Sequence, residues 1–302
     1  MGCTALVAFC AALTCLNLYR LAVELGADDG MAFRVAAIVL FSPAFLFYTS
    51  DMYKDGLVLL LISGALGSAF RLVRRLSVLH VVLGALSLLG LWYVRFYLVF
   101  VTIVPLLVGL SGLGSKSVAR PMFAAVLGAL AFLVIETTTG FFGEMTETGN
   151  SAFALATSEA ALEGNAAAGS GVSFGDGGAA FGSLGPKILY TLFAPFPWQS
   201  GSIGLQLGKI EVLLWYYLLY RAWKSGRRLW REEPVLLLMF LSFLLPSTIM
   251  YATIMTNIGL IVRERMAIVM IGSVLATLSW PAKEEDTQES EAAEGAEEPE
   301  AV

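Results

Sequence analysis

The chain has 302 residues and a formal net charge of −5; 57% of its residues are hydrophobic and only 14% are charged. A soluble domain carries about 25% charged residues, so this chain has too few to cover its own surface in water, which excludes an ordinary soluble protein and makes membrane lipid its surroundings. No basic stretch has the interleaved aromatic residues of a nucleic-acid groove, so the sequence also excludes nucleic acid as a partner.

Apolar segments of roughly the length that crosses a bilayer, about 20 residues, recur along residues 1–280. The predicted spans are residues 2–19, 31–48, 56–71, 78–94, 97–114, 121–137, 207–223, 234–253 and 266–280. The fourth and fifth are separated at Arg95, because a charge at the bilayer centre is costly. The sequence therefore predicts an all-α, polytopic transmembrane helical bundle of about nine spans plus one interfacial or re-entrant helix.

All three cysteines, Cys3, Cys10 and Cys15, lie in the first span, while the single histidine, His80, lies in another segment. These residues cannot form a metal cluster together, so the sequence indicates no metal ligands among them. The cysteines are typical of small apolar positions on a helix.

Residues 138–185 interrupt the apolar pattern, because they are rich in Gly, Ala, Ser and Thr and contain acidic residues but no lysine or arginine. The apolar segment from Pro186 to Trp198 is too short to span, and Pro195 and Pro197 end its helix after Ala194. We predict an extracytoplasmic loop over residues 138–206 with an interfacial or re-entrant helix, and Trp198 at headgroup depth. The proline break either shapes a groove for an acyl or prenyl chain or anchors the interface.

Charge placement sets the topology. Lysine and arginine gather after the third, fifth and seventh spans, which indicates that these loops are cytoplasmic. Residues 281–302 are acidic and lack aromatic residues, which predicts a disordered cytoplasmic tail that could dock a protein partner. With this topology, the polar groups around residues 50–55, 95 and 257–265 share the outer face.

The first of these groups, residues 50–55, holds two carboxylates and a lysine in a short turn. Asp51 and Asp55 are candidate catalytic carboxylates, as general base or metal ligands, and Lys54 is a candidate substrate-binding residue. The alternative is a solvated turn in which Asp55 caps the third span.

The other two groups are built on arginine. Arg95 lies among four aromatic residues, and Arg263 and Arg265 lie together on the side where positive charge is scarce. A guanidinium fork matches phosphate oxygens, so all three are candidate binding residues for a phosphate, with Trp198 beside the bound lipid. The alternatives are that Arg95 snorkels in an aromatic belt, and that the pair contacts Glu264 or lipid headgroups.

Three short windows carry a resemblance. Residues 41–50, followed by Lys54-Asp55-Gly56-Leu57, resemble a stretch in bacterial multi-pass proteins of polysaccharide assembly, which include membrane glycosyltransferases of the GT-C type and polymerases of O-antigen type. Residues 195–198 and the pattern Asn257-x-Gly259-x-x-x-Arg263-x-Arg265 resemble later landmarks of the same group.

The resemblance implies a polyprenyl-phosphate-linked sugar donor, an acidic residue as base and often a divalent metal as cofactor. Carried over, Asp51 or Asp55 is the acidic residue, and Arg263 and Arg265 bind the donor phosphate. In that group the key acid usually lies in the first outer loop, whereas the first loop between spans here is cytoplasmic. This departure implies a relative shortened at its N-terminus, an inverted topology or a loss of catalysis.

The sequence therefore favours a multi-pass protein of the cell (inner or plasma) membrane that acts in lipid-linked glycan assembly, with glycosyl transfer from a polyprenyl-phosphate-linked donor. One alternative is a non-catalytic membrane subunit whose acidic tail docks a partner. The other is a transporter or flippase, for which polar residues at mid-span are typical, and the predicted spans carry almost none.

Overall fold

A computed structural model gives the structure of the chain and describes residues 2–50, 53–113, 137, 141–167, 171–172, 174, 181–199, 203–254 and 256–280. Within these residues the chain is helical and has no β-strand; an isolated bridge joins Gly171 to Asn257. The prediction of an all-α protein is therefore confirmed. Asp51, the acidic tail at 281–302 and the predicted span at 121–137, except for its last residue, lie outside the described residues.

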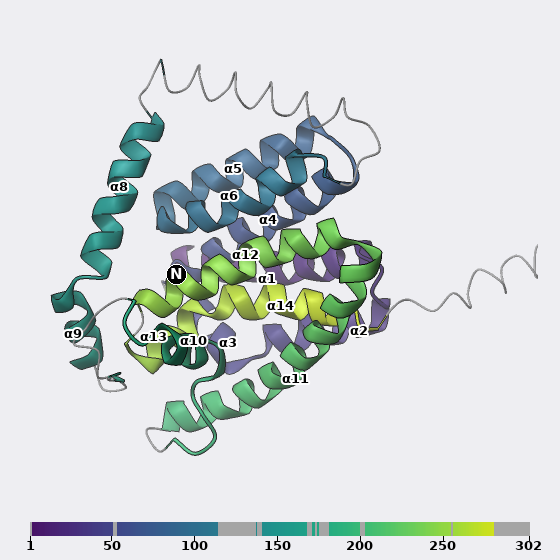
Figure 1. The fold of residues 1–302 in the computed structure, drawn as a ribbon. Helices are drawn as coiled ribbons and strands as arrows, with labels where there is room; N and C mark the ends of the chain where they lie inside the picture. The colour runs from purple at the N-terminus through teal and green to yellow at the C-terminus, as the bar shows by residue number, and fades with distance from the viewer. Residues whose placement is uncertain are drawn as a thin grey trace, which may run out of the picture.

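Most of the helices pack along one another as a bundle, and α8 and α9 lie at one side of it (Figure 1). In chain order they are α1 (Gly2–Glu24), α2 (Asp29–Leu40), α3 (Pro43–Thr49), α4 (Asp55–Arg74), α5 (Val78–Arg95), α6 (Tyr97–Leu110), α8 (Phe141–Ala156), α9 (Glu159–Ala167), α10 (Leu184–Phe193), α11 (Ile203–Glu232), α12 (Pro234–Ile254), α13 (Ile258–Glu264) and α14 (Met266–Thr277).

In the part of the chain that the structure describes, four helices, α1, α4, α5 and α12, are long and apolar enough to cross a membrane. Helices α2 and α3 add a fifth candidate only if they count as one span, because they bend by 60° at the break between them. That break divides the predicted span at 31–48, since the Ser42 hydroxyl accepts from the amide of Phe45 and Pro43 begins a new helix. Helices α6 and α14 have only 14 and 12 residues. The prediction of about nine spans is therefore not confirmed.

The described part of the predicted loop at 138–206 contains three complete helices, and α11 begins at Ile203, before the predicted end of the loop. The short helix expected there is α10, which ends at Phe193, before Ala194 and the cis bond to Pro195. The other two, α8 and α9, were not expected. They carry glutamate in the first turn, which favours a helix N-terminus, but they are too polar to be found by a search for apolar spans.

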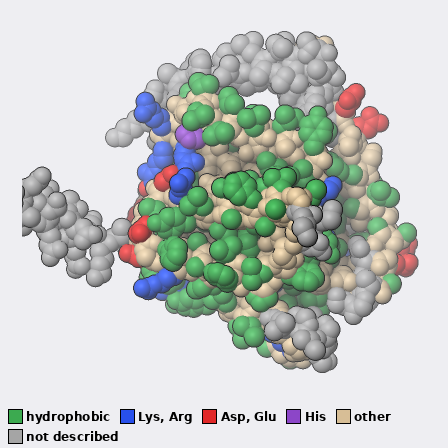
Figure 2. Space-filling model, turned by 180° about the vertical axis from the view of Figure 1, so that it is seen from behind, with side chains coloured by type: hydrophobic (Ala, Val, Ile, Leu, Met, Phe, Trp, Pro, Cys, Tyr) green, Lys and Arg blue, Asp and Glu red, His purple; other side chains and the backbone are tan. Residues whose placement is uncertain are grey.

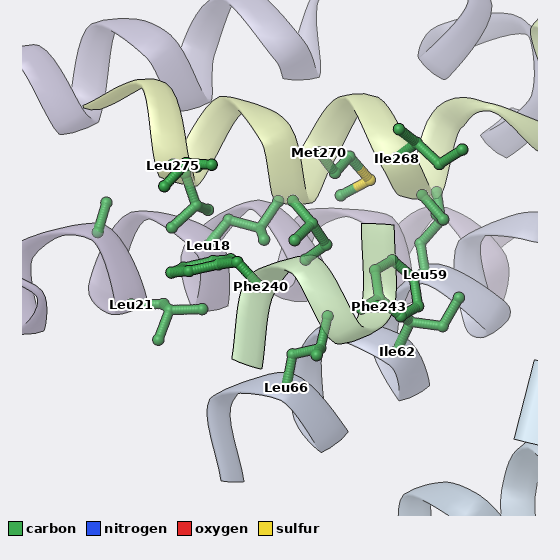
Figure 3. Packing of buried hydrophobic residues seen from close by; sticks show 14 of the residues in the cluster. Leu18, Leu21, Leu59, Ile62, Leu66, Phe240, Phe243, Ile268, Met270 and Leu275 are labelled. Atoms are coloured by element: carbon green, nitrogen blue, oxygen red, sulfur yellow. The ribbon is translucent and has the colours of Figure 1, made fainter. Parts of the chain in front are cut away.

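The core lies where α1, α4, α12 and α14 meet, and their side chains interdigitate there (Figure 3). Its members include Leu18, Leu21, Leu59, Ile62, Leu66, Phe240, Phe243, Ile268, Met270 and Leu275. Two glycines allow adjacent helices to approach closely. A Cβ on Gly109 would lie 2.5 Å from the carbonyl oxygen of Ala69, and one on Gly56 would lie 2.6 Å from that of Val7. Small residues thus set the spacing between α4 and its neighbours α6 and α1.

The two ends of the bundle differ in charge. At the end near α2, called the α2 end, Arg71 pairs with Glu24 at 2.6 Å and Arg74 pairs with Glu233 at 2.8 Å. Figure 2 shows lysine and arginine side chains gathered mainly at this end, and hydrophobic side chains over much of the surface beside it. The opposite end, called the α13 end, holds the N-terminus of α1 together with α13, α10 and α3 (Figure 1).

Candidate functional site

Four charged side chains meet at the α13 end and form a charged network made of Asp55, Arg95, Arg263 and Glu264. The Asp55 carboxylate accepts from Arg95 Nη2 with Oδ1 and from Arg263 Nε with Oδ2, both at 2.8 Å. Arg95 Nη1 donates to Glu264 Oε2. The first residue of α4, the last residue of α5 and the last turn of α13 are thereby held together.

The network is largely buried. The side chains of Asp55, Glu264, Arg95 and Arg263 are 3%, 7%, 13% and 23% exposed, so only Arg263 has a sizeable open surface. The Tyr97 hydroxyl donates to Glu264 Oε2 at 3.3 Å. Burial raises the pKa of the Glu264 carboxyl, and the Arg95 guanidinium opposes that shift. Two carboxylates balance two guanidiniums, as burial of charge requires.

The sequence around α13 explains why Arg263 and Glu264 lie here. Asn257 caps the helix, since its side-chain oxygen accepts from the amide of Gly259 at 2.9 Å and from that of Leu260 at 3.4 Å. The Tyr48 hydroxyl donates to the carbonyl of Gly259 at 3.2 Å, which ties α3 to α13. The residues of the Asn-x-Gly pattern therefore fix the start of a helix whose last turn faces α4 and α5.

Arg263 is the member of the network that is open to a ligand. Its guanidinium lies over the ring of Tyr53 at 4.6 Å and over that of Tyr48 at 5.7 Å. Asp55 takes its Nε, and no other described side chain pairs with its terminal nitrogens. Lys54, adjacent to Tyr53 in the chain, is exposed. Among the described residues the two terminal nitrogens, beside two aromatic rings, are therefore unpaired, which suits an anionic oxygen group.

Arg265 has a different environment from Arg263, although both were predicted to bind one phosphate. It is 1% exposed, and its Nη1 donates to the carbonyls of Ala194 at 2.6 Å, Leu192 at 3.3 Å and Thr191 at 3.4 Å. These carbonyls lie at the C-terminal end of α10, where a cation is favoured. Burial lowers the pKa of Arg265 to about 10, so it is still charged at neutral pH. Arg265 therefore holds α10 and has no surface open to a ligand.

Trp198 is 78% exposed and stacks on Phe196 with the ring centroids 4.9 Å apart. No hydrogen bond, ion pair or ring contact joins it to the four side chains of the charged network. The alternative interpretation of Asp55, a solvated helix cap, does not fit its burial. That of Arg95 as a snorkelling residue does not fit its two ion pairs.

An apolar cavity of about 520 Å³ lies beside the charged network. Tyr97, which donates to Glu264, is also one of its lining residues. The rest of the lining comes from α5–α6, α8 and α12 and includes Phe96, Phe100, Phe153, Met250 and Ile254. Its volume lies within the roughly 300–1,000 Å³ of ligand pockets. A charged site and an apolar cavity thus lie side by side, which suits a ligand with a charged head and an apolar chain.

The described residues do not fit a divalent metal at this site. Both oxygens of Asp55 accept from arginine, and one oxygen of Glu264 accepts from Arg95 and Tyr97. Two guanidiniums already neutralise these acids, so a divalent ion would meet like charge. No cluster of three or more His, Cys, Asp or Glu suited to a metal occurs in the part of the chain that the structure describes.

Sequence reasoning selected Asp55, Arg95 and Arg263, which meet, but treated Glu264 only as a partner for its neighbours and did not single out Tyr48, Tyr53 or Tyr97. The tyrosines flank the charged residues in the sequence, which is the signal that points to them. No protein-family model, curated protein or solved structure matches the chain. The geometry of the charged network is therefore the main guide to its function.

Proposed function

We propose that the chain is a multi-pass protein of the cell membrane that binds a polyprenyl-phosphate-linked sugar at the α13 end and acts in lipid-linked glycan assembly. One observation carries the proposal: Arg263 is held by Asp55 and lies over Tyr48 and Tyr53, and its terminal nitrogens pair with no described side chain. The donor phosphate binds Arg263, with Lys54 nearby. The neighbouring cavity takes part of the prenyl chain.

Glycosyl transfer is the reaction that such a site would serve. The bond between the sugar carbon and the phosphate oxygen breaks, the acceptor oxygen bonds to that carbon, and the acceptor proton passes to a base. Negative charge grows on the departing polyprenyl phosphate, where a guanidinium fixed in a poorly solvated site stabilises it. Arg263 suits this role, and Arg95 adds a second positive charge behind Asp55.

A second candidate function is a non-catalytic subunit that binds the same lipid carrier and docks a protein partner through residues 281–302. It is favoured by the contacts of Asp55, because a carboxylate that already accepts from two arginines is a weak base. In both proposals Asp55 positions Arg263. Asp51, which lies outside the described residues, stays the predicted base of the enzyme.

The Arg263→Gln variant should bind a fluorescent polyprenyl phosphate about 10- to 100-fold more weakly than the wild type, because it loses charge-assisted hydrogen bonds. Fluorescence anisotropy of the full chain in detergent measures this. Arg20→Gln is the matched control, since it removes one exposed arginine from the α1 segment at the α2 end. Equal affinity for the two variants would remove Arg263 from the site.

The enzyme and the subunit are separated by Asp51→Asn in a host that needs the protein. Loss of glycan product with unchanged binding of polyprenyl phosphate supports the enzyme. Full product together with unchanged binding supports the subunit, and loss of a partner after deletion of residues 281–302 then completes that case.

The location of the α13 end is tested by cysteine labelling. Lys54 and Lys224 are exposed and lie at opposite ends of the bundle, and of the native cysteines only Cys3 is exposed. In a Cys3→Ser background, Lys54→Cys should react with an impermeant maleimide on intact cells, and Lys224→Cys only after permeabilisation. The reverse pattern would place the site on the cytoplasmic face.

A further inference from the structure

A second apolar cavity, here called the tryptophan groove, lies between α11, α12 and α14 and has a volume of about 760 Å³. In Figure 1, α11 and α12 diverge from their junction, and α14 lies between them. Trp215, Trp223 and Trp230 line the groove on α11, leucines line it on α12, and Ile268 and Leu275 line it on α14. Trp223 and Trp230 are more than 60% exposed at its edge.

The groove has the length of one lipid leaflet. Its lining on α12 runs from Leu237 to Thr248, which at about 1.5 Å per residue covers roughly 16 Å. That is about half of the ~30 Å hydrocarbon core of a bilayer. An apolar groove of this length, open at the side of the bundle, suits one acyl chain rather than a ligand that spans both leaflets.

Charge marks one mouth of the groove. Arg227 and Arg231 line it at the α2 end and are one helical turn apart, so their side chains lie on the same face of α11. Neither is paired with a carboxylate among the described residues, whereas the adjacent Arg228 pairs with Glu232 at 3.2 Å. Arg227 lies over the ring of Trp223 at 5.1 Å. Two guanidiniums without a described acidic partner, at one end of the apolar tryptophan groove, complement the charge of an anionic lipid headgroup.

We propose that the tryptophan groove binds an anionic phospholipid, with its phosphate on Arg227 and Arg231 and one acyl chain along α12. This lipid is distinct from the polyprenyl-linked donor, because it enters from the opposite end of the bundle. Trp223 and Trp230 lie beside the headgroup, where tryptophan is favoured at membrane interfaces.

Native mass spectrometry of the full chain tests this with two probes, dioleoyl phosphatidylglycerol and dioleoyl phosphatidylcholine at equal concentration. The wild type should retain the anionic lipid about tenfold better, and Arg227→Gln/Arg231→Gln should reduce the preference to about one. The control Arg20→Gln/Lys224→Gln removes the same charge at the same end from residues that do not line the groove, and should keep the preference.

Leu241→Phe narrows the groove without a change of charge and should reduce the binding of both lipids. The wild type carries the decisive comparison, so the test does not depend on how any variant folds. Equal retention of the two lipids by the wild type would overturn the proposal. An equal loss of the lipid preference in the Arg20→Gln/Lys224→Gln control would also overturn it, because it would show that the positive charge of this end attracts the lipid without a specific site. A dimer that Leu241→Phe disrupts while lipid binding stays unchanged would assign the groove to a second copy of the chain and also overturn it.

Discussion

The Asp55→Asn variant should lose about 3–5 kcal/mol of unfolding free energy, because removing one partner of a buried ion pair leaves uncompensated charge. Asp55 is 3% exposed and is the carboxylate that Arg95 and Arg263 share. Arg95 keeps its ion pair with Glu264, but Arg263 keeps no ion pair among the described residues. Unfolding of the detergent-solubilised protein by sodium dodecyl sulfate, followed by circular dichroism, measures the change.

Glu24→Gln is the matched control, because Glu24 also accepts two hydrogen bonds from one arginine, Arg71, but lies 39% exposed at the α2 end. It should cost less than about 1 kcal/mol. The double variant Asp55→Asn/Arg263→Gln should recover part of the loss, with a coupling energy of about 1–3 kcal/mol. Equal losses for Asp55→Asn and Glu24→Gln would mean that the charged network is not buried as described.

The sequence was sufficient to bring Asp55, Arg95 and Arg263 together as candidates. Each lies next to an apolar span, and a consistent placement of lysine and arginine assigns the three to one face. Their pairing could not be predicted, because it depends on how α4, α5 and α13 pack, and Asp55 and Arg263 are far apart in the chain. That Arg263, and not Glu264, is accessible to a ligand likewise follows only from the burial of the two side chains in the structure.

The interpretation of Arg263 and Arg265 as one phosphate clamp shows a limit of sequence reasoning. Residues two apart on a helix point in nearly opposite directions, since each residue turns the helix by about 100°. Arg263 therefore faces Asp55 while Arg265 faces the end of α10. On a helix, residues i and i+2 therefore do not predict a shared ligand.

The count of about nine spans is not confirmed, and part of the difference has a related cause. A run of apolar residues indicates a span by composition alone. It therefore predicts one span at 31–48, although Ser42 and Pro43 carry the signal for a new helix. Composition alone also does not predict α8 and α9, because a polar helix needs no apolar run. Length and composition therefore identified the class of the fold, whereas capping residues determine where its helices break.

Arg265→Leu should be the second most destabilising change, with a loss of roughly 3 kcal/mol. Three carbonyls at the end of α10 lose their charged donor, and hydrogen bonds to a charged group contribute about 1.5–3 kcal/mol each when they are well formed. Leucine also removes a buried charge, which offsets part of the loss. The loss of unfolding free energy therefore stays below the sum of the three hydrogen-bond contributions. Arg265→Lys keeps the positive charge but loses the guanidinium fork, so its stability should lie between that of the wild type and that of Arg265→Leu.

The loss should be local to α10, which separates it from a general weakening of the bundle. Thr191 is 1% exposed on α10, so Thr191→Cys in a Cys3→Ser background should resist a maleimide and become reactive when Arg265→Leu is added. Arg221→Gln is the control, because Arg221 also donates to a backbone carbonyl near a helix end, that of Ser279 at 3.1 Å, but is only half-buried. It should leave Thr191→Cys protected. Protection that persists in Arg265→Leu would mean that the packing of α10 against α12 holds the helix without the arginine.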